Sequence, residues 1–276
     1  MIFKEFELKE EGSLKGAKLT VFIQEPSKEL YIKKRPLVLL CPGGGYEWTS
    51  DREAEPLAFA FMAKGVNTAI LRYSCKPAQY PTALLELGRA MLIIREHAKE
   101  WEVDPDAIIV QGASAGGHLA ASFACFWKED FLSEKLLGAA TKANKEKLRP
   151  NGLLLCYPVI TSGEHAHRGS FDSLIGGRYE ELGDKVSLEK QVNEDVPRTF
   201  IWHTFTDGSV PVENSLLFAT ALRAHNINTE LHIFCEGGHG LSLANEITES
   251  PSRKETVPSC QPWIDLAATW LKAYFK

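Results

Sequence analysis

The sequence predicts an α/β fold with a mostly parallel central sheet of about eight strands and helices on both faces. Short apolar runs alternate with longer helical patterns along most of the 276 residues, as in repeated strand–helix–strand units. The strand-like runs, such as Leu37–Cys41, are apolar throughout rather than at every second position. Such runs are typical of strands whose two faces are both covered by helices.

The predicted strands are short and lie between turn residues. Within the first thirty residues, the alternating pattern of Met1–Leu8 favours an antiparallel opening hairpin. The later strands are predicted at residues 37–41, 68–73, 107–111, 152–157, 199–203 and 230–235.

The helices are predicted from apolar spacing and from their end signals. Ser50 and Asp51 are candidate caps for a helix that ends near Gly65, and Thr82 is the candidate cap of the next helix, where apolar residues recur every three or four positions. The predicted helices cover residues 51–64, 82–98, 116–127, 212–224 and 262–273.

We expect residues 1–276 to form one domain with a lid-like insert at about residues 160–196. No change in composition marks a domain boundary along the chain. The stretch 160–196 is polar, contains five glycines and interrupts the strand–helix rhythm.

The composition excludes several classes of protein. Apolar residues make up 44% and charged residues 24%, which excludes a disordered chain. The net charge of −5 argues against nucleic acid as a partner, and no apolar run is long enough to span a membrane. The N-terminus lacks the apolar core of a signal peptide, and the six cysteines contain no Cys-x-x-Cys pair. We therefore expect a cytoplasmic protein with reduced, buried cysteines and no bound metal.

The strongest functional signal is the segment Gly112–Gly116, which reads G-x-S-x-G. It lies between an apolar strand and a helix, where a nucleophile elbow exposes its serine hydroxyl above the sheet. Ser114 is the candidate nucleophile, and the N–H of Ala115 at the helix start is a candidate oxyanion donor. The alternative is an ordinary helix-capping serine.

A serine nucleophile needs a base and an orienting acid. In proteins with a nucleophile elbow, the acid and then the histidine follow the serine along the chain. Asp207 follows the strand at 199–203 and His239 follows the strand at 230–235. Because parallel strands end at the same sheet edge, both can reach Ser114. Asp195 lies before its strand, His203 and His232 lie within strands, and His118 favours a packing role. Asp172 and Asp184 fall in the insert.

Three glycines follow the first parallel strand at the place where the second oxyanion donor is expected. Gly44 and Gly45 lack Cβ atoms, so their amides can turn into the site. A phosphate-binding loop is the alternative, but the spacing fits neither G-x-G-x-x-G nor a P-loop. Tyr46 and Trp48 are candidate substrate contacts near the mouth, with Phe205, Trp263 and the insert residues His165, His167 and Arg168 as weaker ones.

Taken together, these motifs resemble the α/β-hydrolase superfamily, and within it the esterases that include acetyl xylan esterases and the related acetyl/feruloyl esterases. The resemblance spans about residues 37–245 and is carried by Pro42–Tyr46, Ser50–Pro56, Leu71–Ser74, Gly112–Ala120, Trp202–Thr204 with Asp207, Pro211–Ser215 and Gly238–Gly240. One departure is Pro42, where many lipase-like relatives have histidine, so which glycine amides point inward is open and the Tyr46 amide is another candidate.

The resemblance implies a serine carboxylesterase with Ser114, Asp207 and His239 as triad and Gly44, Gly45 and Ala115 as oxyanion donors. The expected substrate is a small acyl ester, above all an acetyl group on a sugar or xylo-oligosaccharide, with no cofactor. The alternatives are an amidase, formamidase or peptidase of the same fold, or a non-catalytic ligand-binding protein. The oligomeric state is not predicted.

Overall fold

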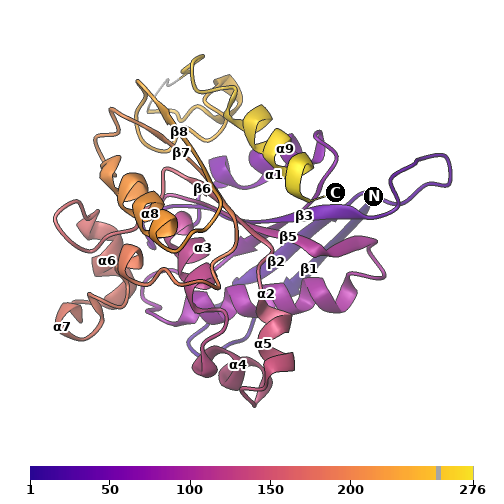
Figure 1. The fold of residues 1–276 in the computed structure, drawn as a ribbon, viewed down its shortest axis with the longest axis horizontal. Coiled ribbons are helices and arrows are strands. Elements are labelled where there is room, and N and C mark those ends of the chain that lie inside the picture. Colours follow the sequence, from indigo (N-terminus) through magenta and orange to yellow (C-terminus); the bar gives the residue numbers. More distant parts are fainter. Residues whose placement is uncertain (253–255, 276) are drawn as a thin grey trace.

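The computed structural model describes residues 1–252 and 256–275 and contains one eight-stranded sheet (Figure 1). Its strand order is β1-β2-β4-β3-β5-β6-β7-β8. β1 and β2 run antiparallel to their neighbours, while β3 to β8 run parallel to one another. The strands are β1 (Ile2–Glu7), β2 (Lys18–Ile23), β3 (Arg35–Cys41), β4 (Asn67–Arg72), β5 (Val103–Ala113), β6 (Gly152–Cys156), β7 (Thr199–Thr204) and β8 (Thr229–Phe234). The predicted sheet and opening hairpin are confirmed.

Helices cover both faces of the sheet, as Figure 1 shows. Alternate residues of one strand enter different cores: Leu39 packs in the core beneath α2 and α3, and Leu40 in the core beneath α1 and α9. This explains why the strand runs are apolar throughout. The helices that correspond to the five predicted ones are α1 (Glu55–Met62), α2 (Thr82–His97), α3 (Ala115–Phe126), α8 (Glu213–Ala224) and α9 (Trp263–Tyr274).

The predicted helix at residues 51–64 is wrong in one respect, because it is broken at Ala54. A 3-10 turn, η1 (Asp51–Glu53), precedes α1, and Ser50 makes no capping hydrogen bond with its side chain. Pro56 lies in the first turn of α1, where a missing N–H is tolerated, but it could not continue a helix from the preceding turn. Glu53, the last residue of the 3-10 turn before this break, is buried.

Other helix ends differ slightly from prediction. Thr82 is the first residue of α2 rather than its cap. Two short helices that the sequence analysis did not predict, α4 (Asp130–Leu137) and α5 (Lys142–Leu148), pack against α2.

The segment between β6 and β7 contains short helices α6 (Arg168–Ile175) and α7 (Tyr179–Leu182) and the turn η2 (Leu188–Lys190). It is anchored to the rest of the chain by hydrogen bonds, including Tyr80 N–H to the Leu174 carbonyl. Across the ranges 1–252 and 256–275, no helix combines the length and the apolar character needed to cross a membrane.

Candidate active site

Ser114 stands at a strained turn between β5 and α3. Its φ is +53°, in the left-handed region that non-glycine residues rarely occupy. A Cβ built on Gly112 would lie 2.1 Å from the Gly116 carbonyl oxygen, and one built on Gly116 would lie 2.0 Å from the Cys41 carbonyl oxygen. The turn therefore requires glycine at both positions, which is the physical reason for the G-x-S-x-G pattern.

The structure brings Ser114, His239 and Asp207 into one hydrogen-bonded chain. Ser114 Oγ lies 2.7 Å from His239 Nε2, and His239 Nδ1 lies 2.7 Å from Asp207 Oδ2. The Asp207 side chain is fully buried, whereas the His239 side chain is 17% exposed. Because a charged carboxylate only accepts, His239 carries its proton on Nδ1 and leaves Nε2 to accept the serine proton.

Asp207 is held as a charged acceptor by four hydrogen bonds. Oδ1 accepts from the N–H groups of Ser209 and Val210, both at 2.9 Å, while Oδ2 accepts from His239 and from His203 Nε2 at 3.2 Å. Burial alone raises the pKa of Asp207, but the hydrogen bonds from His203 and His239 outweigh it and hold the pKa well below its usual 3.8.

His203 is a second histidine on this aspartate, and sequence reasoning identified it only as a packed strand residue. Its Nε2 lies 3.0 Å from the Val210 carbonyl oxygen, which can only accept, so Nε2 carries the proton. Its Nδ1 then accepts from Ser215 Oγ at 2.8 Å. In the sequence, His203 and Asp207 are four positions apart on either side of a strand end, and this spacing could have indicated that the two side chains meet.

The candidate oxyanion amides belong to residues around Ser114: Gly44 and Gly45 line the same cavity as Ser114, and Ala115 follows it in the chain. Ala115 is the first residue of α3, so its N–H has no partner within the helix. The N–H of Gly43 donates to Glu53 Oε2 at 2.8 Å, whereas no acceptor occurs within residues 1–252 and 256–275 for the N–H of Gly44 or Gly45. A Cβ on Gly44 would lie 2.2 Å from the Trp48 carbonyl oxygen, so this loop also requires glycine.

A cavity of about 500 Å³ opens over Ser114, His239, Gly44 and Gly45. Trp48, which is 60% exposed, lies on its wall as predicted. Of the three candidates in the insert, His165, His167 and Arg168, the cavity is lined by His167. Phe205 and Trp263 are not among its lining residues. Its lining also includes Gly44, Gly45, Arg52, Glu53, Ser114, Gly169, Ser209, His239 and Gly240. Glu53 was not singled out as a site residue from the sequence.

The prediction that Tyr46 contacts substrate is wrong. Its side chain is turned inward and Tyr46 is only 3% exposed. The hydroxyl lies 2.9 Å from His118 Nδ1, and His118 Nε2 donates to the Val186 carbonyl at 2.8 Å. Tyr46 therefore anchors the glycine segment to α3, and His118 has the packing role predicted for it. Trp263, another suggested contact, is fully buried and stacks on Trp202.

The other candidate acids and histidines lie apart from Ser114. Asp195 and Asp184 pair with lysines, Asp172 accepts from Tyr179, and His232 pairs with Glu230 on β8.

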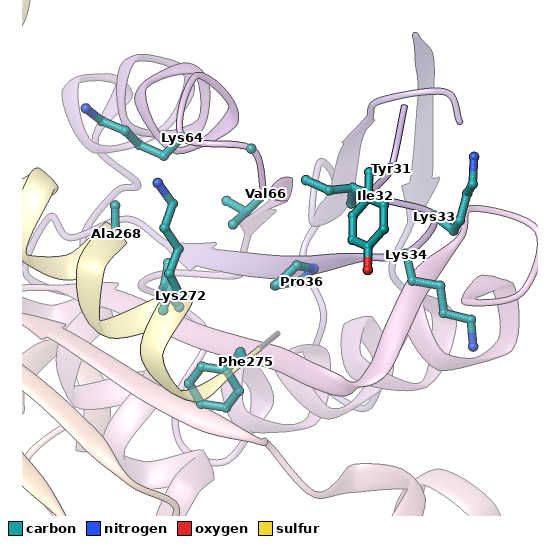
Figure 2. A pocket seen from close by; sticks show the side chains of 12 residues that line it. Tyr31, Ile32, Lys33, Lys34, Pro36, Lys64, Val66, Ala268, Lys272 and Phe275 are labelled. Atoms are coloured by element: carbon teal, nitrogen blue, oxygen red, sulfur yellow. The ribbon is translucent and has the colours of Figure 1, made fainter. Parts of the chain in front are cut away.

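A second cavity of about 580 Å³ lies near the amino-terminal ends of β3 and β4, between residues 31–36 and α9 (Figure 2). Its described lining is apolar residues, one glycine and four lysines, with Tyr31 and Phe275 at opposite sides. No serine, histidine or carboxylate belongs to that described lining, so the cavity over Ser114 is the site suited to acyl chemistry.

Comparison with known proteins identifies the family of the chain. The sequence profile of the BD-FAE family matches residues 23–222, a range that contains Ser114 and Asp207 and ends before His239. The structure resembles that of an acetyl ester-xyloside bifunctional hydrolase from Caldicellulosiruptor lactoaceticus, with a TM-score of 0.80 and 36% identity over 93% of this chain and 88% of that one.

Two curated proteins are longer than this chain. Endo-1,4-beta-xylanase B of Butyrivibrio fibrisolvens is 36% identical over 224 residues, 77% of this chain and 33% of its own length. The acetylxylan esterase of Xylanibacter ruminicola is 26% identical over 209 residues, 73% of this chain and 40% of its own length. The chain thus matches well under half the length of either curated relative.

Proposed function

This chain belongs to the BD-FAE family, and from that premise we propose that it is a serine carboxylesterase that hydrolyses short-chain acyl esters, above all acetyl esters. The observation that carries the proposal is the chain of two 2.7 Å contacts from Ser114 through His239 to Asp207, at the floor of an open cavity. This arrangement supplies an activated nucleophile, a base and an orienting acid in one place.

Acylation begins when His239 Nε2 takes the proton of Ser114 Oγ as that oxygen attacks the ester carbonyl carbon. The carbonyl π electrons move onto oxygen, and the amides of Gly44, Gly45 and Ala115 receive the negative charge. Removal of one such donor raises the barrier by about 3 kcal/mol in a known case. The tetrahedral intermediate then collapses, the bond to the alcohol oxygen breaks, and the imidazolium protonates the leaving alcohol.

Deacylation repeats the same steps with water. His239 accepts a proton from water, hydroxide oxygen attacks the acyl carbon, and the collapsing intermediate releases the carboxylic acid while Ser114 Oγ regains its proton. Asp207 stays ionised throughout and stabilises the imidazolium formed in each half-reaction.

Acetylated sugars, including xylo-oligosaccharides, are the proposed substrates. The relatives named as an acetyl ester-xyloside hydrolase and an acetylxylan esterase support this class. Trp48 supports it too, since an exposed indole on the cavity wall is a suitable surface for a sugar ring.

The test is a hydrolysis assay on aryl esters of increasing acyl length and on acetylated xylo-oligosaccharides, with acid release measured directly. We expect the highest kcat/KM on acetyl esters and a loss of at least about a thousandfold in Ser114→Ala. Wild-type rates in Ser114→Ala, or no hydrolysis of any ester by the wild type, would overturn the proposal. A matched acetyl amide separates an esterase from an amidase.

We further propose one catalytic domain in which residues 160–196 form a wall of the cavity. The positions of His167 and Gly169 in its lining support this. A cytoplasmic location is proposed from the six free thiols, which suit a reducing compartment. Cell fractionation followed by thiol counting tests the location.

A further inference from the structure

Two loops must be aligned on Ser114 if the proposed chemistry is to work. The glycine loop, residues 42–46, carries the oxyanion amides, and the histidine loop, residues 236–248, carries His239. They follow β3 and β8, which are separated by three strands in the sheet, so no strand pairing holds them together. Both loops contact the 3-10 turn η1, whose residues Arg52 and Glu53 have no role in the mechanism above.

Glu53 binds the backbone of the glycine loop through its carboxylate. The residue is 4% exposed, and its Oε2 accepts the Gly43 N–H at 2.8 Å. A Cβ on Gly43 would lie 2.7 Å from that oxygen and 2.8 Å from Ser114 Cβ, so the loop backbone is held between the carboxylate and the nucleophile. The Gly43 carbonyl accepts from the Ser50 N–H at 2.9 Å. With the Gly43 amide occupied, the next amides are the ones that face the cavity.

The other carboxylate oxygen of Glu53 reaches towards the histidine loop through Tyr157. The Tyr157 hydroxyl donates to Glu53 Oε1 at 2.7 Å and accepts the Ser242 N–H at 3.0 Å. Burial, with the Glu53 charge nearby, raises the pKa of Tyr157 well above 10, so the hydroxyl keeps the proton that it donates. The Tyr157 ring packs edge-on against the His239 imidazole, with centroids 5.2 Å apart. One side chain thus contacts Glu53 and the histidine loop together.

Arg52 binds the histidine loop directly. Its guanidinium donates to the carbonyls of Gly240 at 2.8 Å and Thr248 at 2.5 Å. In return, Ser242 Oγ donates to the Arg52 carbonyl at 2.6 Å. All three contacts are made to residues that follow His239 in the histidine loop, and Gly240 is its immediate neighbour. Adjacent residues of one turn therefore bind the two loops, Glu53 the glycine loop and Arg52 the histidine loop.

We propose that Arg52 and Glu53 are positioning residues that lock the glycine loop and the histidine loop to each other, so that the oxyanion amides and the imidazole are aligned on Ser114 as a unit. The inference rests on the proposed esterase function and adds to it a brace that touches none of the reacting atoms. Misplacement of a catalytic group by about 1 Å can cost about a hundredfold in rate. Loss of the brace therefore lowers kcat while substrate binding is retained.

The test compares Glu53→Ala, Glu53→Gln and Glu55→Ala with the wild type on an aryl acetate. Active sites are counted by titration with a fluorophosphonate, so that kcat is expressed per competent site and an unfolded fraction does not count. Glu55 is the matched control, because it lies two residues further on, pairs with Arg72 and does not line the cavity.

We expect kcat per titrated site to fall about a hundredfold in Glu53→Ala, with KM within about twofold of wild type. Glu53→Gln, which keeps an acceptor for the Gly43 N–H, falls only about tenfold, and Glu55→Ala is unchanged. Both Glu53 variants within threefold of wild type would overturn the proposal, as would a rise in KM with unchanged kcat. If Glu53→Ala does not fold, Glu53→Gln decides alone, and a loss under threefold overturns it.

Ser114→Ala is measured in the same assay to keep the two proposals apart. Hydrolysis that persists in Ser114→Ala defeats the proposed function itself. If hydrolysis is lost in Ser114→Ala but kcat is unchanged in both Glu53 variants, the esterase proposal stands and the positioning role of Glu53 is wrong.

Discussion

The floor and the wall of the cavity over Ser114 are built differently. On the floor, Ser114 and Glu53 are buried, as is Asp207 behind His239, and each is hydrogen-bonded to a residue from a distant part of the chain. On the wall, Trp48 is 60% exposed and His167 comes from the segment between β6 and β7. The difference indicates that the reaction is determined by the sheet edge and its buried braces, and the choice of substrate by exposed loop side chains. Changes on the floor should therefore alter kcat, and changes on the wall should alter KM.

The largest effect is expected for Asp207→Asn. The amide would present N–H groups towards His239 and His203, which both donate to Asp207 Oδ2, so His239 would have to adopt the other tautomer. We expect kcat to fall by about 10⁴-fold, as in the known case of this substitution. Steady-state kinetics with an aryl acetate measures it, and a loss below tenfold would mean that Asp207 does not orient the base.

A large effect on stability is expected from His118, which supports the glycine loop through Tyr46. Burial lowers the pKa of His118 to about 4, although its bond to the Val186 carbonyl raises it. The folded pKa lies below the unfolded value of about 6.5, so the unfolded chain binds a proton at His118 before the folded protein does. The free energy of unfolding is therefore at its full value above about pH 6.5 and decreases as the pH falls towards 4. The loss amounts to about 3 kcal/mol.

The measurement is the free energy of unfolding in urea at several pH values between 7 and 4. The comparison is with His118→Gln, which does not titrate and keeps a donor for the Val186 carbonyl. The variant should show a shallower fall in stability over this range. Equal slopes for the two proteins would contradict the assignment.

The effect of His203 should be smaller, because its contact with Asp207 is longer than that of His239. A hydrogen bond to a charged group contributes about 1.5 kcal/mol at the low end, or about tenfold in kcat. In His203→Phe the carboxylate loses this donor, so kcat on an aryl acetate should fall about tenfold while KM is unchanged. An unchanged kcat would leave His203 a structural role only.

The smallest effect is expected on the wall, for Trp48→Ala. Loss of one stacked aromatic surface is worth about 1 kcal/mol, or about fivefold in KM for an acetylated xylo-oligosaccharide. Hydrolysis of a small aryl acetate should not change. The control is Tyr31→Ala, an aromatic that is 98% exposed and lines the distant cavity of Figure 2. A fall in kcat with Trp48→Ala would remove the distinction between floor and wall.

The triad residues could be predicted from the sequence, whereas the residues that brace the loops could not. The elbow at Ser114 depends on five consecutive residues between a strand and a helix, and Asp207 and His239 each follow a strand, so their meeting at one sheet edge was predictable. Such features need only local patterns and the parallel arrangement of the strands.

The braces could not be predicted because their partners are distant in sequence. Tyr157 is 104 positions from Glu53, and Gly240 is 188 positions from Arg52. Glu53 lies in the 3-10 turn before Ala54, where the sequence favoured a continuous helix. Tyr46 was placed wrongly because its φ of +59° turns the phenol towards His118, a direction that residue type alone does not reveal. Loop geometry, more than strand order, limited the prediction.

The most direct test of the account is reaction of the native protein with a fluorophosphonate, followed by peptide mapping. We predict a single adduct on Ser114 that forms in step with the loss of ester hydrolysis and is much slower to form in His239→Ala. Hydrolysis that disappears while Ser114 stays unmodified, or that continues after Ser114 is fully modified, would contradict the account.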